Sequence, residues 1–505
     1  MQYMSVRDAA QRFGISERRI QKLCEQGRIP GSRMISSVWI IPDNAEKPED
    51  ARFALTPPES NLLSLKGLSS LLSISEATAR NWQRLGKITP SDYFRGRPVF
   101  TRDYAETLKK KLVSGENTAL RSRRNKKYVS GSSLYRDYVS ESPKNAEAIG
   151  QVLSCLAEHG IVPDENVLRL IAAECALQLF AQRYGIPSDK RSALLRDFLC
   201  GRLSVQPYDG LVSDLTGDPD SAALFVKEHE GLFSAEFTYE EYSDIIGWIY
   251  ISCRSMSERK ATGTYYTPET TVRALMEDAF GKEMQAAGKR ILDPCCGTGN
   301  FLLQLPPEIP PENVHGSDID ETSVLIARIN LALKFRGCDA AILRRNITVR
   351  DSMEDDGREC FDLVIGNPPW GFDYPESEKE HLRERFRTAR GKCVESYDLF
   401  IEQSFRKLST GGRLAFVLPE AALSVRAHRP VREEIMRSGR IAAVRYLGNV
   451  FDRVQCPCVI LTAIKDPESF TSRGMRISTS ERSFSIETER KVSAECFSFT
   501  VTDDE

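Results

Sequence analysis

The sequence lacks any apolar run approaching the roughly 20 residues that would span a bilayer, so we expect no membrane association. Charged side chains interrupt its N-terminal segment, which argues against a secretory signal and predicts a cytoplasmic protein. Histidine is scarce, at 5 of 505 residues, and the 13 cysteines are odd in number and lack the paired spacing of a zinc site. We therefore expect reduced thiols and no metal.

The chain also lacks an excess of charge of either sign. Its formal net charge is -2, so any affinity for nucleic acid must come from local basic faces. Hydrophobic residues make up 41% and charged residues 28% of the chain, a balance typical of folded globular proteins. The length of 505 residues is too great for one ordinary core and predicts several domains.

Residues 1–45 predict a small helix-turn-helix module. Helices are expected over 6–13 and 17–26, because a serine can cap each start and Gly14 can turn the chain between them. A short hairpin over 28–42 is expected to follow.

Residues 60–105 repeat this plan, with helices expected over 65–72 and 76–85 before a second hairpin. The order of elements resembles the winged DNA-binding modules of the excisionase and MerR type. That resemblance implies that the second helix of each module contacts DNA. The candidate contact residues are Arg18, Arg19, Lys22, Arg80 and Arg84. The alternative is that both modules dock other proteins.

The next two segments differ in charge and pattern. Residues 106–142 form a strongly basic linker, which is either a solvated connector or a segment that contacts phosphates. Residues 143–256 have apolar side chains at three- and four-residue spacing and predict a helical domain. That segment contains no convincing nuclease pattern.

Residues 257–466 alternate strand and helix patterns. The candidate strands are 290–292, 314–318, 342–349, 361–365, 412–418, 442–447 and 458–464. This alternation predicts an α/β, Rossmann-like domain with a doubly wound, mostly parallel sheet, whose ligands bind beyond the carboxyl ends of its strands. The last two strands leave no room for a helix between them, so we expect them to pair antiparallel.

A loop with two glycines follows the first of these strands and opens a helix. Its sequence is Asp293-Pro-Cys-Cys-Gly-Thr-Gly-Asn-Phe301. Glycine lets the backbone approach a ligand closely, and the helix N-terminus offers free N–H donors. A third glycine, as in the dinucleotide-binding fingerprint, is missing, and an acid precedes the loop. The pattern therefore suits a cofactor with a positively charged amino-acid end.

Acidic residues end the next two strands. Asp318 could accept both hydroxyls of a ribose, the neighbouring Ile319 could pack on an adenine ring, and Asp351 could reach the adenine amino group. Any one of these acids alone would be an ordinary residue at the end of a strand. Their order at successive strand ends favours a nucleoside site.

The sharpest signal is Asn367-Pro368-Pro369-Trp370, directly after the apolar strand 361–365. The prolines stiffen the loop and fix the direction of the Pro368 carbonyl, while the Asn367 amide oxygen is a second acceptor. Two such acceptors could hold both hydrogens of a planar amino group and expose its lone pair to an in-line methyl donor. Trp370 offers a flat face on which a base could stack.

With the segment Gly263-Thr-Tyr-Tyr-Thr-Pro268, these motifs resemble the gamma-class N6-adenine DNA methyltransferases of restriction-modification systems. The resemblance covers residues 257–466. It implies S-adenosylmethionine as cofactor and methylation of an adenine that is flipped out of double-stranded DNA. It further implies that Phe451 and Trp370 contact that base.

The resemblance also assigns the remaining site residues. Catalysis is expected at Asn367, Pro368, Pro369 and Trp370. The cofactor is expected to contact Tyr266, Thr267, Pro268, Asp293, Pro294, Gly297, Thr298, Gly299, Asn300, Phe301, Asp318, Ile319 and Asp351.

Many relatives carry a large recognition domain after the catalytic one, whereas residues 467–505 look like only the start of such a domain. We therefore expect a separate specificity subunit, as in type I and some split type II systems, with a restriction nuclease as a further partner. Two alternatives stay open. The chain could methylate RNA or a protein glutamine, which also present planar nitrogen acceptors, or it could be a DNA-binding regulator with an inactive methyltransferase fold.

Overall fold

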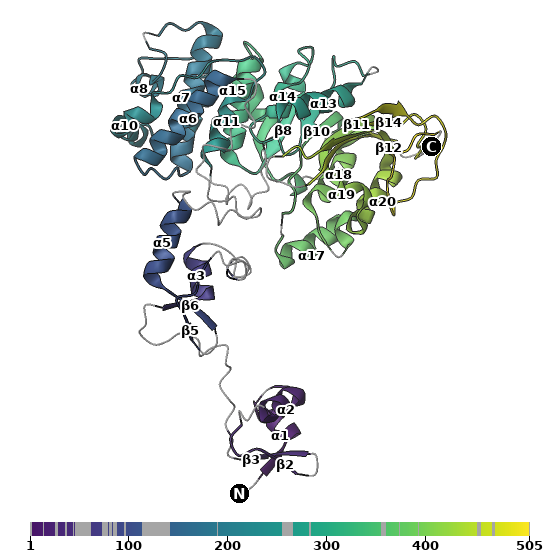
Figure 1. Cartoon of the computed structure of the whole chain (residues 1–505). Helices are drawn as coiled ribbons and strands as arrows, with labels where there is room; N and C mark the ends of the chain where they lie inside the picture. Colours follow the sequence, from purple (N-terminus) through teal and green to yellow (C-terminus); the bar gives the residue numbers. More distant parts are fainter. Residues whose placement is uncertain are drawn as a thin grey trace. The chain divides into compact units, whose positions relative to one another are not determined.

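The computed structural model divides into two compact units, Met1–Ser130 and Gly131–Glu505 (Figure 1). The residues that it describes are 3–13, 15–25, 29–35, 38–43, 45, 62–72, 79, 83, 88–94, 97–113, 142–188, 190–254, 266–281, 284–354, 360–372, 374–391, 393–451, 456–466 and 470–503. No helix within these ranges is both long and apolar enough to cross a membrane.

The first unit holds two small modules, each with a three-stranded sheet. The first module contains β1 (Tyr3–Ser5), α1 (Val6–Phe13), α2 (Glu17–Glu25), β2 (Arg33–Ile35) and β3 (Val38–Pro42). The second contains β4 (Leu62–Ser64), α3 (Leu65–Leu71), β5 (Asp92–Phe94) and β6 (Arg97–Thr101), and α5 (Arg102–Val113) follows it. The strand orders, β1-β3-β2 and β4-β6-β5, are equivalent.

The two modules also share their strand register. Tyr3 pairs with Pro42 in the first module, and Leu62 pairs with Thr101 in the second, both antiparallel. The strand arrangement of the first module is therefore repeated in the second, among the residues described. The predicted helix over 76–85, with Arg80 and Arg84, falls almost wholly outside them, as does most of the basic linker.

The second unit begins with helices α6 (Pro143–Glu158), α7 (Glu165–Tyr184), α8 (Leu194–Leu199), α9 (Asp209–Thr216), α10 (Pro219–Glu228) and α11 (Ile245–Cys253), with a 3-10 turn at Glu230–Phe233. Local chemistry sets the bounds of α7. The Asp164 carboxylate accepts the Val167 N–H at 2.9 Å, and Gly185 ends the helix with φ of 67°.

A nine-stranded sheet follows, in the order β15-β14-β12-β13-β11-β10-β7-β8-β9. Its strands are β7 (Ile291–Asp293), β8 (Val314–Asp318), β9 (Ile347–Val349), β10 (Phe361–Gly366), β11 (Leu408–Pro419), β12 (Gly439–Gly448), β13 (Cys458–Lys465), β14 (Arg476–Ser478) and β15 (Ser483–Ser485). Strands β7 to β11 pair in parallel, whereas β13 runs antiparallel between β11 and β12. The predicted sheet and its antiparallel last pair are confirmed.

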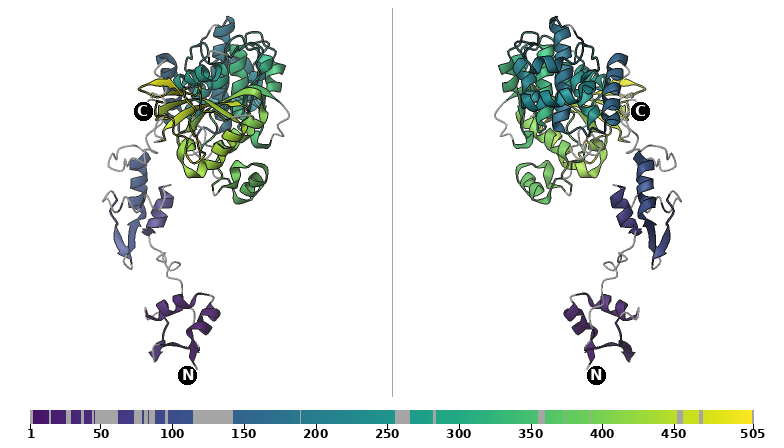
Figure 2. Two further views of the ribbon diagram at one scale, coloured as in Figure 1. Left: turned by 90° about the vertical axis from the view of Figure 1, so that its right-hand side faces the viewer. Right: turned by 90° about the vertical axis from the view of Figure 1, so that its left-hand side faces the viewer.

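Helices cover both faces of this sheet (Figures 1 and 2). They are α13 (Glu269–Phe280), α14 (Asn300–Leu303), α15 (Glu321–Lys334), α16 (Ala340–Asn346), α17 (Glu376–Arg385), α18 (Ser396–Lys407), α19 (Ala421–Ser424) and α20 (Arg429–Ser438). Alternate residues of β11 enter two different cores: Ala415 and Val417 face one, and Phe416 and Leu418 face the other. Both faces of the sheet are therefore buried.

The helical segment shares the first of these cores. Phe180 on α7 and Ile249 on α11 belong to the same cluster of buried side chains as Ile365 and Val417 of the sheet. Helices α7 and α11 both pack on α15. Residues 143–256, expected to form a domain of their own, therefore add a layer to the α/β fold.

One predicted strand is partly wrong. Residues 342–346 of the candidate strand 342–349 belong to α16 (Ala340–Asn346), and only Ile347–Val349 is extended. The Asp339 carboxylate caps this helix by accepting the Ala341 N–H at 2.8 Å. The buried residues of this helix, Leu343 and Asn346, are three residues apart, a spacing that fits a helical turn. A short apolar run does not by itself separate helix from strand.

The C-terminal segment also differs from the expectation of a further domain. Strand β14 pairs in parallel with β12, and β15 pairs with β14, so the segment extends the sheet. Phe497 and Phe499 enter the second core. The buried Arg432 guanidinium donates to the carbonyls of Ala494 and Glu495 at 2.6 and 3.0 Å. Residues 470–503 are therefore part of this fold.

Candidate active site

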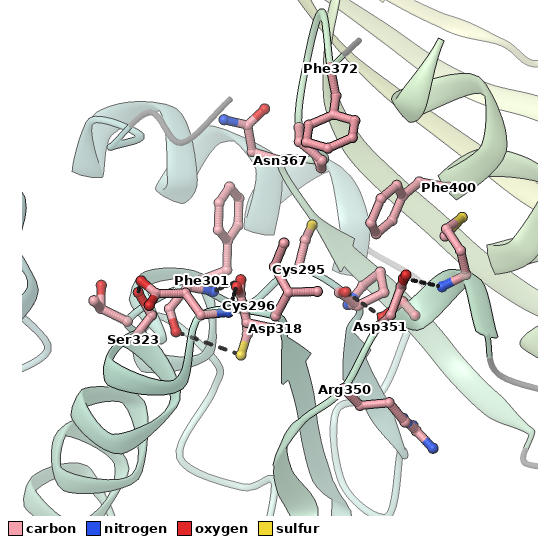
Figure 3. A pocket seen from close by; sticks show the side chains of 18 of the residues that line it. Cys295, Cys296, Phe301, Asp318, Ser323, Arg350, Asp351, Asn367, Phe372 and Phe400 are labelled. Carbon is pink, nitrogen blue, oxygen red and sulfur yellow. Dashed lines mark hydrogen bonds between the residues drawn. The ribbon is translucent and has the colours of Figure 1, made fainter. Parts of the chain in front are cut away.

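A pocket lies beyond the carboxyl ends of the parallel strands, where the predicted motifs meet (Figure 3). The predicted residues that line it are Tyr266, Thr267, Pro294, Gly297, Thr298, Asn300, Phe301, Asp318, Ile319, Asp351, Asn367 and Pro369. Six others do not line it: Pro268, Asp293, Gly299, Pro368, Trp370 and Phe451. Gly263 to Tyr265 lie outside the described residues.

The glycine loop turns between β7 and α14. Gly297 and Gly299 have φ of 50° and 89°, in the left-handed region that side chains disfavour. The Asp318 carboxylate, from the end of β8, accepts the Gly297 N–H at 2.8 Å. A side-chain contact between neighbouring strand ends therefore holds the loop at the mouth of the pocket.

Asp293 is fully buried beneath this loop. Its Oδ1 accepts the Cys295 N–H at 3.1 Å, while Oδ2 has no hydrogen-bond partner among the described residues. Burial, with the nearby negative charge of Asp318 as a smaller cause, raises the pKa of Asp293 to about 8. A cationic group placed near this carboxyl would favour its ionised form.

The end of β8 presents a carboxylate and an apolar side chain together. Asp318 Oδ1 accepts the N–H of Asp320 at 3.0 Å, and burial raises the pKa of Asp318. Ile319 is 64% exposed although it lines the pocket. An isoleucine left open inside a pocket offers a surface for a flat apolar ring.

Asp351 lies at the far side of the pocket, after β9. Its carboxylate is exposed and accepts the Met353 N–H at 2.8 Å (Figure 3). The three predicted strand-end acids therefore follow β7, β8 and β9, which are neighbours in the sheet. Two of them, Asp318 and Asp351, face the pocket, and Asp293 supports it from below.

Asn367 follows β10 and presents an unpaired acceptor. Its Nδ2 donates to Thr267 Oγ1 at 3.1 Å, which fixes the plane of the amide. Its Oδ1 is buried and has no partner among the described residues. Asn300 Nδ2 donates to the Thr267 carbonyl at 2.8 Å. Thr267 therefore ties the segment before α13 to both the glycine loop and the Asn367 loop.

Residues at the start of α18 hold the proline loop in place. The Ser396 hydroxyl donates to the carbonyl of Pro369, and Glu395 Oε1 accepts the Gly371 N–H at 2.7 Å. The Pro369 carbonyl is thus already engaged. No motif predicted this support, because α18 begins well after the loop.

Trp370 and Phe451 pack against each other rather than line the pocket. Their rings meet edge to face, with centroids 5.0 Å apart and an interplanar angle of 89°. Phe451 is only 3% exposed, although the resemblance implied a ring that contacts a base. Trp370 Nε1 is buried with no partner among the described residues. Contact of either ring with a base stays a prediction.

Aromatic residues that the motif analysis missed form one wall of the pocket. Phe372, Tyr374 and Phe400 line it, and Phe372 and Phe400 lie near Asn367 in Figure 3. Phe372 and Tyr374 follow Trp370 closely, so the aromatic spacing was a usable signal. No sequence signal of this kind marked Phe400, which lies on α18.

The N-terminal candidates can be placed only in the first module. Arg18 and Lys22 are exposed on α2, and Arg19 is half-buried. The opposite face of α2 buries Ile20, Leu23 and Cys24, so the exposed face carries positive charge.

Comparisons with known proteins agree with this site. The model of the N-6 DNA Methylase family matches residues 241–495, and a helix-turn-helix domain model matches residues 3–44. The chain is 29% identical over 230 residues to the type II methyltransferase M.VspI of Vibrio sp. (strain 343), covering 45% of this chain and 53% of that protein. It is 24% identical over 202 residues to the methylase subunit of the type I restriction enzyme EcoEI of Escherichia coli, covering 37% and 39%.

Among solved structures, the type I restriction-modification methyltransferase subunit of Streptococcus thermophilus matches at a TM-score of 0.44 and 16% identity, covering 66% of this chain and 87% of that one. The chain spans about half the length of the known relatives that it matches. The family match extends over half of the chain and includes every motif of the pocket. The chain belongs to the N-6 DNA methylase family.

Proposed function

We propose that this chain is a restriction-modification DNA methyltransferase that transfers a methyl group from S-adenosylmethionine to the N6 amino group of adenine. The observation that carries the proposal is the buried, unpaired Oδ1 of Asn367 at the edge of the pocket. A buried acceptor without a donor is costly, at about 1–3 kcal/mol, so such an atom is expected to meet a donor in the ligand. An exocyclic amine supplies that donor.

The residues of the pocket fit S-adenosylmethionine. The unpaired Oδ2 of Asp293 lies beneath the glycine loop, where an ammonium group nearby would favour the charged form of the carboxyl. Asp318 would accept ribose hydroxyls, and Ile319 would pack on the adenine ring of the cofactor. When bound, S-adenosylmethionine supplies an electrophilic methyl group.

The chain's own residues would then position the acceptor amine. Asn367 Oδ1 would accept one of its hydrogens and the Pro368 carbonyl the other. Thr267 and Ser396 keep this loop from rotating, because they bond the Asn367 amide and the Pro369 carbonyl. Asparagine is not a base, so it orients the amine and stabilises charge on it without removing a proton before transfer.

Double-stranded DNA is the substrate that we propose, for two reasons. The N6 atom is paired inside the duplex, so the adenine must leave the stack to reach a pocket of this kind. The N-terminal module exposes Arg18 and Lys22 on one helix, as phosphate contacts require. RNA or a protein glutamine also presents a planar nitrogen, but neither accounts for the helix-turn-helix module.

We also propose a separate specificity subunit and a restriction nuclease as partners. The relatives include the methylase subunit of a type I restriction enzyme. Residues 470–503 extend the sheet and pack into its core, so this segment does not itself form a recognition domain.

Methyl transfer to unmethylated bacterial DNA tests the proposal. The chain is incubated with tritiated S-adenosylmethionine and DNA, with and without the product of the adjacent gene, and the methylated base is identified. N6-methyladenine only with the partner supports both the activity and the separate subunit. N6-methyladenine from the chain alone removes the subunit and assigns target choice to this chain. If tritium enters RNA or protein and not DNA, the proposed substrate is wrong. If the chain does not bind S-adenosylmethionine, the proposed activity is wrong.

A further inference from the structure

A buried carboxylate from the helical segment contacts the glycine loop. Asp244, 1% exposed, caps α11: its Oδ1 accepts the Gly247 N–H at 2.8 Å. Its other oxygen, Oδ2, accepts the hydroxyl of Thr298, which lies between the two loop glycines. One carboxylate therefore joins the start of a helix to the middle of the loop.

Helix α15 completes this contact from the other side. Asn330, also buried, donates through Nδ2 to Asp244 Oδ1 at 2.6 Å and to the Thr298 carbonyl at 2.8 Å. Thr298 is thus held at both its hydroxyl and its backbone carbonyl. Since all three side chains are almost fully buried, water does not compete for these bonds.

Gly247 leaves the space that this cluster needs. A Cβ atom there would lie 2.3 Å from Asp244 Oδ2 and 2.3 Å from Thr298 Oγ1. Glycine inside a helix usually costs about 0.5–1 kcal/mol relative to alanine. Here the lack of a side chain allows α11 to approach the loop closely.

The other end of α11 contacts the next strand end. Tyr250 Oη and Arg254 Nη1 donate to Asp320 Oδ2 at 2.9 and 3.0 Å. Asp320 lies two residues after Asp318 and caps α15, where the Ser323 hydroxyl also donates to it. Helix α11 therefore touches both segments that face the cofactor end of the pocket.

We propose that α11 is a splint that holds the cofactor loop in its ligand-binding shape, with Asp244 as the main positioning residue. The inference rests on the proposed function, because it names S-adenosylmethionine as the ligand of that loop. Gly297 and Gly299 make the loop flexible by themselves, so ordering it on binding would cost conformational entropy. Bonds from Asp244 and Asn330 order it beforehand, which favours binding.

Asp244→Ala tests the role directly, with Asp244→Asn as the conservative variant. Alanine removes the bond to Thr298 of the loop, together with the bonds to Gly247 and Asn330. It should raise the Kd for S-adenosylmethionine about 10- to 100-fold, as expected for a lost bond to a charged group. Asparagine can keep them, since its oxygen accepts from Gly247 and Asn330 while its NH2 donates to the Thr298 hydroxyl. The Kd of Asp244→Asn for S-adenosylmethionine should therefore be close to that of the wild-type chain.

Asp164→Ala is the matched control. Asp164 also caps a helix of the same segment, by accepting the Val167 N–H, but among the described residues it forms no bond to the loop. This variant should lose thermal stability and keep its cofactor Kd. Equal Kd values for Asp164→Ala and Asp244→Ala would overturn the proposal, because loss of any cap would then explain the effect.

Gly247→Ala inserts one methyl group between α11 and the loop. It should raise the cofactor Kd about tenfold, with kcat at saturating cofactor much less affected, because the acceptor end is untouched. Unchanged binding in this variant would contradict the splint.

Hydrogen exchange of the Gly297–Asn300 amides separates this inference from the proposed function. In the protein without cofactor, Asp244→Ala should speed their exchange, and Asp164→Ala should not. Faster exchange in a protein that binds no S-adenosylmethionine would support the splint and sink the proposed function. Unchanged exchange with weaker cofactor binding would sink the splint alone.

Discussion

The two ends of the pocket differ in how their polar groups are paired. At the glycine-loop end, Gly297, Thr298 and Asn300 form hydrogen bonds to other parts of the chain. Near Asn367, two buried polar atoms have no partner among the described residues. At the first end the glycine loop is held in place before a ligand arrives, although Asp293 Oδ2 beneath it has no hydrogen-bond partner among the described residues. The second contains Asn367 Oδ1 and Trp370 Nε1, whose burial is offset only by a ligand or a rearrangement. The difference separates groups whose bonds already shape the site from buried polar atoms that have no partner among the described residues.

The largest effect is expected for Asn367→Ala, which tests whether the two ends of the pocket have separate roles. Removing the unpaired acceptor should lower kcat about 10³-fold, the size of effect seen when one preorganised polar group is lost from an active site. The cofactor Kd should change far less, because the glycine loop is anchored independently. Single-turnover methyl transfer and equilibrium binding measure the two quantities.

Thr267→Ser is the control for that measurement, since it keeps the hydroxyl that accepts from Asn367 Nδ2. It should retain most of the transfer rate. A loss of cofactor affinity in Asn367→Ala as large as its loss of kcat would mean that the two ends do not act separately.

The pH dependence of cofactor binding tests Asp293, whose buried Oδ2 has no partner among the described residues. Burial raises the pKa of Asp293 to about 8, so the carboxyl is mostly protonated at neutral pH without a ligand. If an ammonium group binds the ionised form, affinity should rise about tenfold per pH unit below pH 8 and level off above it. Calorimetry between pH 6 and 9 measures this slope.

The same shift has the opposite sign for stability without ligand. Folded Asp293 keeps a proton that the unfolded chain releases near pH 4, so its contribution to the free energy of unfolding falls as pH rises from about 4 to 8. Asp293→Asn should weaken the pH dependence of both the cofactor affinity and the free energy of unfolding. A steep binding profile in that variant would assign the proton to another group.

Phe451→Leu tests whether the ring of Phe451, which packs on Trp370, has a role in methyl transfer. Leucine keeps most of the buried apolar contact with Trp370, so unfolding should cost less by no more than about 1.5 kcal/mol. Base–aromatic stacking is worth about 1–3 kcal/mol, so loss of the ring should lower transfer about tenfold if the ring reaches the base. Activity per folded molecule is compared with that of Phe416→Leu, a fully buried control on β11. Equal activity in both variants would leave Phe451 as a core residue.

The smallest effect is expected outside the pocket. Replacing Arg18 and Lys22 by alanine should weaken DNA binding a few-fold and reduce its dependence on salt by about one unit for each lost phosphate contact. Neither the cofactor Kd nor kcat at saturating DNA should change. DNA titrations at several salt concentrations measure the slope, and an unaltered slope would favour a protein-docking role for this module.

Much of this site could be predicted from the sequence because its parts follow strand ends. Asp293 and Asp318 end β7 and β8, and Asp351 and Asn367 come just after β9 and β10. Parallel strands bring their carboxyl ends to one edge of a sheet. Strand periodicity and turn residues are local properties, so β8 has the predicted bounds.

Tertiary structure alone decided which of these residues have partners. Asp244 has no motif around it, and only the packing of α11 on α15 brings its carboxylate to Thr298. Phe451 lies in a loop that suggested exposure, yet its ring is buried against Trp370. Local sequence fixes backbone periodicity and turns, whereas burial and hydrogen-bond partners depend on contacts between segments far apart in the chain, which no local pattern encodes.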